Sequence, residues 1–333
     1  MLGDIKVSII CIVYNHEKYI EKALNGFLMQ KVNFNYEILI HEDASTDNSS
    51  NILKKYENKY RDKIKVIYQK ENKYSKGISP SKPLYEMAQG KYLAICEGDD
   101  YWIDENKLQK QVDFLEKNLE YVATYHNVFV VDSKGEKLKN DLEWPIKKSH
   151  TINIIDLEKN IYLCGQTASI VCRNFWRGWN QIEKDKYLKC RANGDRKLSI
   201  IFTLMGKVYF FKEIMSSYRK VTSHGDSYTA RIRGKNRTFH MYNSLIDLQK
   251  LALELFDYDY KIDVHLKDCF YYALVFMMKN PNKKNFQIFI KILKIYKNKL
   301  EIIIYSVNRL FKLLVRKIKG CFKRKKMELL NAK

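Results

Sequence analysis

The stretch Val7-Ser8-Ile9-Ile10-Cys11-Ile12-Val13-Tyr14 decides the fold of this chain. Its apolar residues run without alternation and most are β-branched, which is typical of a strand covered on both faces, as in a parallel sheet. A helical pattern through Leu28 follows, then a second strand at residues 36–41, a second helix, and a third strand at residues 64–68. This order predicts right-handed crossovers and an α/β fold, in which a doubly wound, mostly parallel sheet carries helices on both faces.

The fourth predicted strand, residues 92–96, runs directly into Glu97-Gly98-Asp99-Asp100. Three carboxylates within four residues repel one another, and a hard cation such as Mg²⁺ or Mn²⁺ would neutralise them through oxygen ligands. We expect Gly98 to let a ligand approach the backbone between the flanking side chains. The alternative is a solvated acidic turn that caps the following helix. The loop taken alone leaves both interpretations open.

Two other strand ends should face the same crevice, because ligands of doubly wound sheets bind beyond the carboxyl ends of the strands. Tyr14 ends the first strand and Asp43 follows the second. Tyr14 could stack on a nucleotide base, and Asp43 could accept the N–H of a uracil ring. The alternatives are a core tyrosine and a helix-capping aspartate. For Asp47, in the same loop, we favour helix capping.

Three segments together resemble family 2 glycosyltransferases. They read VSIICIVYN at residues 7–15, EILIHEDASTD at residues 37–47 and GKYLAICEGDDYW at residues 90–102. The similarity extends over roughly residues 5–225, and the order and spacing of the three segments make it specific. The resemblance implies a GT-A fold, an inverting mechanism and a nucleotide-sugar donor, more often a UDP-sugar than another.

The resemblance also implies roles for single residues on the donor side. The uridine would lie against Val13, Tyr14, Asn15 and Asp43. Glu97-Gly98-Asp99 stands in the place of the family's Asp-x-Asp motif. We therefore expect Asp99 to contact the metal directly. Glu97 departs from the pattern and should lie nearer the ribose or the sugar, while remaining a candidate ligand. Lys82 falls, by a loose match, where the family often keeps a basic residue near the donor.

An inverting mechanism needs a carboxylate that takes the proton of the acceptor hydroxyl. In the family this base lies far beyond the metal motif, at the start of a helix, and Asp195 of Asn193-Gly194-Asp195 matches that place. The alternative is a plain N-cap aspartate. The acceptor-side and loop candidates are Gln166, Thr167, Trp102 and Arg219.

A later segment, with Arg219, Lys220 and His224, would by the same resemblance fold over the diphosphate. His224 is a further candidate metal ligand. The alternative for all three residues is an ordinary surface loop.

Composition and charge limit the class of protein. The chain has 333 residues, 46% of them hydrophobic, which is enough for a large core. Its seven cysteines form no C-x-x-C pair, which indicates free buried thiols in a reducing cytoplasm. No run of about 18 apolar residues is present, so we expect no spanning helix. Residues 279–333 hold 17 Lys/Arg and 2 Asp/Glu of a chain with net charge +22. The basic balance thus belongs to the tail, and no nucleic-acid partner is expected.

We predict a catalytic domain over residues 1–230, with a nucleotide-sugar half to about residue 103 and an acceptor half over about 104–230, and a helical basic region over 231–333. From Phe286 to Leu314 apolar residues recur at 3-4 spacing, which indicates a heptad seam on one helix face. Three interpretations stay open. The helix packs on the catalytic domain, forms a homodimer seam through residues 286–318, or lies on an anionic membrane surface.

These patterns predict a metal-dependent, inverting glycosyltransferase with a UDP-sugar donor and a saccharide or lipid-linked acceptor. We expect it to build a bacterial surface polysaccharide from the cytoplasm, as a peripheral protein on the inner face of the membrane. A sugar nucleotidyltransferase is one alternative, and the absence of a Gly-rich phosphate loop near the N-terminus argues against it. A non-enzymatic basic protein that binds membranes or polyanions is another, and the set Glu97, Asp99 and Asp195 argues against that.

Overall fold

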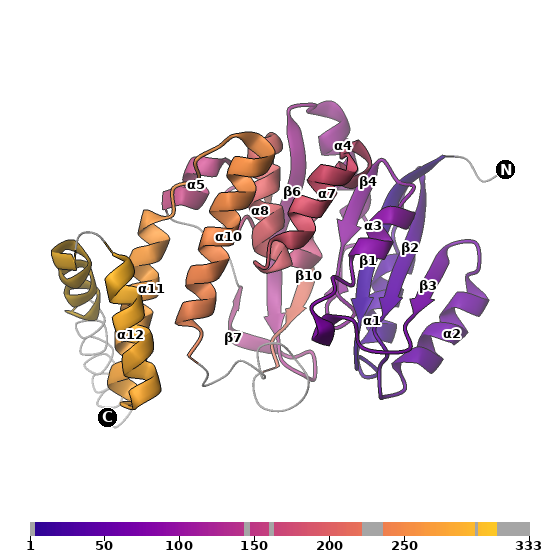
Figure 1. Cartoon of the computed structure of the whole chain (residues 1–333). Coiled ribbons are helices and arrows are strands. Elements are labelled where there is room, and N and C mark those ends of the chain that lie inside the picture. Colours follow the sequence, from indigo (N-terminus) through magenta and orange to yellow (C-terminus); the bar gives the residue numbers. More distant parts are fainter. Residues whose placement is uncertain (1–3, 143–146, 160–162, 222–235, 297–298, 312–333) are drawn as a thin grey trace, which may run out of the picture. The chain divides into compact units, whose positions relative to one another are not determined.

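The computed structural model describes residues 4–142, 147–159, 163–221, 236–296 and 299–311. It confirms the predicted α/β fold, with a largely parallel sheet and helices around it (Figure 1). The described strands form one sheet of ten, in the order β3-β2-β1-β4-β9-β6-β10-β5, with β7 attached to β6 and β8 to β10.

Alternating strands and helices build the first half of the sheet. Strand β1 pairs in parallel with β2 on one side and β4 on the other, and β2 pairs in parallel with β3. Most of β1 is buried, as its unalternating apolar run predicts. The elements are β1 (Ile5–Val13), α1 (Ile20–Leu28), β2 (Asn35–Glu42), α2 (Ser49–Lys59), β3 (Ile64–Tyr68), α3 (Lys82–Met87) and β4 (Tyr92–Ile95), with a 3₁₀ turn at Tyr74–Lys76.

Antiparallel pairing joins this half to the rest of the sheet. Strand β9 runs antiparallel to both β4 and β6, whereas β6 and β10 are parallel. The short β5 directly follows the acidic loop and pairs with β10, which anchors the far end of that loop. The elements are β5 (Tyr101–Trp102), α4 (Lys107–Lys117), β6 (Tyr121–Val131), β7 (Lys137–Leu142), β8 (His150–Ile152), α5 (Ile154–Lys159), a 3₁₀ turn at Thr167–Ser169, β9 (Val171–Arg173), α6 (Phe175–Gly178), α7 (Gln181–Lys189), α8 (Gly194–Met205) and β10 (Lys207–Arg219).

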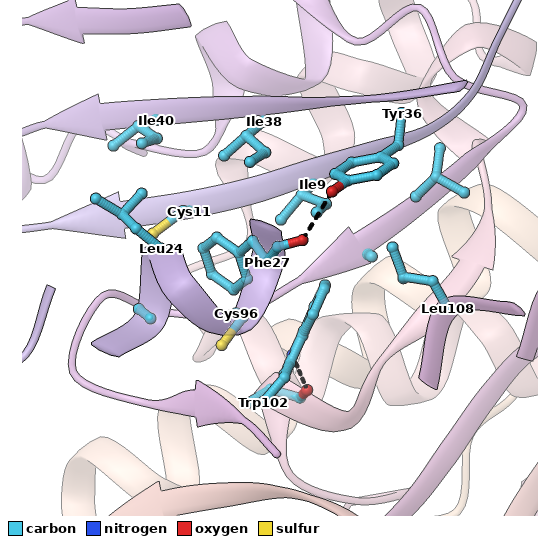
Figure 2. Close-up of a cluster of buried hydrophobic side chains, with 14 of the residues drawn as sticks. Ile9, Cys11, Leu24, Phe27, Tyr36, Ile38, Ile40, Cys96, Trp102 and Leu108 are labelled. Atoms are coloured by element: carbon cyan, nitrogen blue, oxygen red, sulfur yellow. Dashed lines mark hydrogen bonds between the residues drawn. The ribbon is translucent and has the colours of Figure 1, made fainter. Parts of the chain in front are cut away.

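The main core packs side chains of α1 and α4 against β1, β2 and β4 (Figure 2). The rings of Phe27 and Trp102 meet edge to face, with centroids 4.8 Å apart. The Tyr36 hydroxyl donates to the Phe27 carbonyl (3.0 Å), and Trp102 Nε1 donates to the Ala168 carbonyl (2.9 Å). Because Trp102 closes the acidic loop, this packing fixes one end of the loop in the core.

The C-terminal region is helical, as predicted, and consists of α10 (Thr238–Phe256), α11 (Asp263–Lys279), α12 (Lys283–Ile295) and a helix over residues 299–311. The prediction of one continuous heptad seam is wrong. Helix α12 ends at Ile295, and Tyr296 turns to an extended conformation with ψ 123°. Before this break, Phe289 and Leu293 pack into a small core with Phe270 and Ile292, on α11 and α12.

The chain divides into two compact units, one of residues Met1–Arg233 with Lys250–Asp259, the other of Gly234–Gln249 with Tyr260–Lys333. The predicted domain boundary at residue 230 stays a prediction. All six cysteines in the described part of the chain are buried and form no disulfide, as their spacing indicated. Among the described residues, no helix combines the length and the apolar character needed to cross a membrane.

Candidate active site

Three loops meet at one edge of the sheet, at the carboxyl ends of β1, β2 and β4. The Asp43 amide donates to the Val13 carbonyl (2.9 Å), and the Gly98 amide donates to the Ile12 carbonyl (3.0 Å). These bonds extend the β1 ladder into both neighbouring loops. The end of β1 therefore lies between two acidic segments. We call residues 42–47, which begin at the last residue of β2, the first acidic loop, and residues 97–100 after β4 the second acidic loop.

Gly98 is required by packing at the end of β1. A Cβ there would lie 2.9 Å from His16 Nδ1 and from Val13 Cγ2, and 3.0 Å from Ile20 Cδ1. The space that a Cβ would occupy is filled by the side chains of Val13, His16 and Ile20, and the approach of a ligand to the Gly98 backbone stays a prediction.

His16 is a site residue that the sequence did not single out. Its Nε2 lies 4.0 Å from Asp99 Oδ2, and its Nδ1 is buried without a hydrogen-bond partner among the described residues. Asn15 brings it there, since a φ of 56° turns the chain back at the end of β1. The one signal in the sequence was its position directly after Tyr14 and Asn15.

The second acidic loop brings three carboxylates together. One ligand oxygen each from Glu97, Asp99 and Asp100 lies within 4.8 Å of the others. Asp100 is 1% exposed, and its two oxygens accept hydrogen bonds from the Arg219 amide (2.7 Å) and from Gln166 Nε2 (2.8 Å). Glu97 and Asp99 reach solvent instead, with the Asp99 side chain 25% exposed. The oxygen donors that remain open to a ligand are therefore those of Glu97 and Asp99.

Arg219 supports this loop from β10. Its Nε donates to the Asp99 carbonyl (2.9 Å), and its guanidinium also donates to the Asp132 (2.8 Å) and Ser133 (3.1 Å) carbonyls of the turn after β6. The guanidinium also stacks over the Tyr19 ring, 4.3 Å from its centroid. The same residue predicted to fold over a diphosphate thus holds the backbone of the acidic loop.

The pKa values of this loop reflect burial and mutual repulsion. Desolvation, followed by the charges of Asp99 and Asp195, raises the pKa of Glu97 to about 8. The Glu97 side chain is nevertheless exposed, so water screens part of this effect. Desolvation, followed by Asp99 and Glu97, raises the pKa of Asp100 well above its usual range. Excess negative charge of this kind favours a bound cation, and oxygen ligands suit Mg²⁺ or Mn²⁺.

Asp195 belongs to the same electrostatic neighbourhood, because its charge contributes to the raised pKa of Glu97. It lies in the first turn of α8, where Asn193 is the N-cap residue. Asp195 is therefore not the N-cap of this helix. Burial raises the pKa of the half-buried Asp195 carboxyl, and a carboxylate with a raised pKa is a better proton acceptor.

The comparison with known proteins agrees with this geometry. Residues 8–179 match the model of glycosyl transferase family 2. The chain belongs to this family. The chain spans 62% of the length of the first curated relatives it matches.

Individual relatives cover different shares of this chain. An uncharacterized protein of Mycobacterium tuberculosis, Rv1520, is 33% identical over 233 residues, which are 68% of this chain and 62% of that protein. Bacillus subtilis EpsE, named as a glycosyltransferase, is 36% identical over 131 residues, 39% of this chain and 45% of that protein. The crystal structure of S. aureus TarS 1–349 with UDP-GlcNAc has a TM-score of 0.59 at 16% identity, covering 87% of this chain and 80% of that one. This likeness shows the fold, and it agrees with the predicted GT-A type.

In the first acidic loop, both carboxylate oxygens of Asp43 already have hydrogen-bond partners. Asp43 is 1% exposed, and its Oδ1 and Oδ2 accept the Lys73 (2.7 Å) and Tyr74 (3.1 Å) amides. His41 Nε2 lies 3.3 Å from Oδ1. A carboxylate oxygen can accept more than one hydrogen bond, so the contact between Asp43 and uracil stays a prediction. Beside it, Tyr14 is half-buried.

The remaining predicted residues are divided between the loop, the core and the surface. Gln166 caps the 3₁₀ turn that contains the half-buried Thr167, and it holds Asp100. Trp102 lies in the core, 2% exposed, so it shapes the loop and is closed to an acceptor. Lys82 pairs with Glu86 on the surface of α3 (3.6 Å). His224 lies outside the described residues.

Proposed function

We propose that this chain is an inverting, metal-dependent glycosyltransferase that transfers a sugar from a UDP-sugar to a hydroxyl of a saccharide or lipid-linked acceptor. One observation carries the proposal. Glu97 and Asp99 present open carboxylates at the edge of the sheet, and Asp195, from a distant helix, is close enough to perturb the pKa of Glu97. Carboxylates that could hold a metal ion beside a candidate base suit inverting transfer, because the ion would stabilise the leaving group and the base would activate the acceptor.

The donor set of the loop fits a hard divalent cation. Asp99 would hold Mn²⁺ or Mg²⁺ with Glu97 beside it, whereas Asp100 is already occupied by Arg219 and Gln166. A bound ion supplies neutralisation of the charge that develops on the departing nucleoside diphosphate. Arg219 and Gln166 keep the loop in a fixed position, so that little reorganisation is needed when donor binds.

Asp195 would act on the acceptor. Its carboxylate takes the proton of the acceptor hydroxyl as that oxygen attacks the anomeric carbon, from the face opposite the nucleotide. The bond between the anomeric carbon and the phosphate oxygen breaks as the new glycosidic bond forms, which inverts the configuration. Burial favours this role, since a raised pKa increases the basicity of the Asp195 carboxylate.

The nucleotide side of the proposal rests on β1 and β2. Tyr14 would stack on the base, Val13 and Asn15 form the floor of the nucleotide site, and Asp43 accepts the uracil N–H. The TarS structure of similar fold was determined with UDP-GlcNAc, which supports a nucleotide-sugar donor and favours UDP. The six buried cysteines of the described residues form no disulfide, which suits a reducing compartment, and we place the activity in the cytoplasm.

Asp195→Asn tests the assignment of the base. Transfer should fall about 10³-fold, because a general base contributes 10²- to 10⁴-fold. The affinity for UDP with Mn²⁺, measured by calorimetry, should stay unchanged. Asp113→Asn, an exposed acid on α4, is the matched control and should leave both quantities unchanged. Full activity in Asp195→Asn would contradict the role of Asp195.

The donor can be identified by a thermal-shift screen of UDP-, GDP- and dTDP-sugars with Mn²⁺. A ligand that binds only the native state stabilises it by mass action, so the true donor should raise the melting temperature most. A larger shift with GDP- or dTDP-sugars would replace UDP in the proposal.

A further inference from the structure

The helix over residues 299–311 carries an apolar stripe on its open side. Five large apolar side chains are between 45% and 69% exposed there. They are Leu300, Ile303, Ile304, Val307 and Phe311. Their spacing of three, one, three and four residues places them on one side of an α-helix. Single exposed apolar residues are common on protein surfaces, but a contiguous stripe of this kind marks an interaction surface.

The opposite side of this helix is fixed to α11. Ile302 is fully buried and shares a small core with Phe270 and Ala273 of α11. The Tyr305 hydroxyl donates to Asp268 Oδ1 (2.6 Å), and the Arg309 guanidinium pairs with the same carboxylate. These contacts set the rotation of the helix about its axis. The stripe is therefore displayed outward by specific contacts on the other face.

The sequence that contains the stripe is strongly basic. Residues 279–333 hold 17 Lys/Arg and 2 Asp/Glu, a net charge of +15. On the described helices, Lys283, Lys284, Lys291 and Lys294 of α12 are exposed. Glu301, the single acidic residue among 299–311, is paired with Lys267 of α11. An apolar stripe in such a basic setting has the composition of a helix that lies at a membrane interface.

We propose that this stripe docks on an anionic lipid bilayer, with the five side chains in the headgroup region and the lysines against acidic headgroups. The stripe could be covered by a lipid surface or by a second copy of the chain, and the net charge favours the lipid surface. A second copy of the chain would bring two segments of net charge +15 together, and this repulsion opposes a dimer through the stripe. An anionic surface attracts the same charges. Among the described residues no helix is long and apolar enough to cross a membrane, and the proposal is therefore of a helix that lies along the surface.

Sedimentation with lipid vesicles tests the proposal on the full chain. We expect the protein to sediment with vesicles of phosphatidylcholine and phosphatidylglycerol at low salt, less at high salt, and hardly with phosphatidylcholine alone. Ile303→Gln/Val307→Gln should weaken binding by at least about tenfold, because each substitution removes one apolar side chain from the lipid. Leu119→Gln/Ile182→Gln is the matched control, since both residues are exposed elsewhere on the chain, and it should bind like the wild type.

Other outcomes would overturn the proposal. A large fall in melting temperature for Ile303→Gln/Val307→Gln would mean that the stripe is covered by this chain itself. A dimeric wild type and a monomeric variant would identify a second copy as the occupant. Absence of sedimentation with anionic vesicles at low salt would exclude the bilayer. Transfer to a soluble acceptor should be unchanged in the variant, so this test is independent of the catalytic assignments.

Discussion

The first and second acidic loops both flank the end of β1 and carry three carboxylates each, counting Glu42 at the end of β2, yet these carboxylates have different partners. In the first loop every carboxylate accepts backbone amides. Glu42 accepts that of Ser45, Asp43 those of Lys73 and Tyr74, and Asp47 those of Glu17 and Ser49. In the second loop Asp100 alone is held in this way. Among the described residues, none donates a hydrogen bond to the carboxylates of Glu97 and Asp99.

This difference supports our proposal that the second acidic loop, and not the first, holds the metal ion. A carboxylate that accepts amide hydrogen bonds is stabilised as an anion and organises the backbone around it. In the second loop burial, followed by the mutual repulsion of the carboxylates, raises the pKa values of Glu97 and Asp100. We therefore expect the first loop to contribute to stability, and we propose that the second loses stability by its mutual repulsion and gains affinity for a cation.

The largest effect expected from this comparison is the loss of function in Asp99→Asn. Transfer should fall about 10³-fold, because stabilisation of charge at the reacting phosphate depends on this carboxylate. The Mn²⁺-dependent part of the UDP affinity should disappear in a calorimetric titration. The melting temperature should change by no more than about 2 °C or rise, since one of three repelling charges is removed.

Asp43→Asn provides the contrast for this experiment. It should keep the metal dependence of UDP binding, although its overall affinity for UDP falls if Asp43 accepts the uracil N–H. Loss of metal dependence in Asp43→Asn, with its retention in Asp99→Asn, would reverse the roles that we assign to the two loops.

Lys107, a buried cation behind the second loop, gives the next largest effect. Its ammonium group is fully buried, 4.2 Å from the centroid of the Trp102 ring, and has no hydrogen-bond partner among the described residues. Burial lowers its pKa from 10.5 to about 7. Lys107→Met removes the charge at similar volume, and we expect it to raise the free energy of unfolding at pH 6 by about 3 kcal/mol, after the loss of the cation–π contact.

The gain in the free energy of unfolding of Lys107→Met over the wild type should fall as the pH rises. Between pH 7 and 10.5 the unfolded chain binds a proton at Lys107 that the folded chain does not, so the stability of the wild type rises with pH across this window. The advantage of the variant should therefore shrink from pH 7 to pH 10 in urea denaturation. Lys110→Met is the control, because Lys110 is exposed and pairs with Asp104 (2.6 Å), and its effect should be small at every pH.

The sequence predicts the strands and helices that carry this site better than it predicts the separate roles of the carboxylates within it. The apolar run of β1 and the helix–strand alternation after it are local signals, and they gave the parallel half of the sheet. Asp99 and Asp100 are neighbours with the same side chain, and their difference comes from distant partners. Gln166 is 66 residues from Asp100, and Arg219 is 119 residues from it. No spacing rule within the motif contains that information.

The sequence also failed to predict the position of His16 and the end of the heptad seam, and in both cases the local backbone conformation is the reason. His16 reaches Asp99 because Asn15 adopts a positive φ. Asparagine tolerates this backbone conformation but more often adopts a negative φ, so the sequence alone does not predict it. The predicted heptad seam ended at Tyr296, where the extended backbone lets the tyrosine hydroxyl donate to the Asp263 carbonyl (3.0 Å). Apolar periodicity continues through such a break, because both helices on either side of it have an apolar face.

Asp43→Asn is also a test of stability in the first loop. In the variant, the side-chain NH₂ group of the asparagine would face one of the two backbone N–H groups, of Lys73 or Tyr74, that now donate to a carboxylate oxygen. One hydrogen bond is lost, and two donors face each other. We expect the free energy of unfolding to fall by about 2 kcal/mol, the cost of an unsatisfied buried donor. Urea denaturation measures this, with Asp62→Asn, an exposed acid, as the control. A stability equal to wild type would mean that the first loop is no better satisfied than the second.

The smallest effect is expected for Gln166→Met, which removes one of the two hydrogen bonds to Asp100. Asp100 keeps the Arg219 amide, and the 3₁₀ turn loses its cap because Gln166 Oε1 also accepts the Ala168 amide (2.6 Å). The free energy of unfolding should fall by about 1 kcal/mol. Because Asp100 acts through the position of Asp99, kcat should fall several-fold while the affinity for UDP with Mn²⁺ stays within about twofold. A rise in the KM for the acceptor at unchanged kcat would instead place Gln166 against the acceptor, and Asp100 would lose its role as a positioning residue.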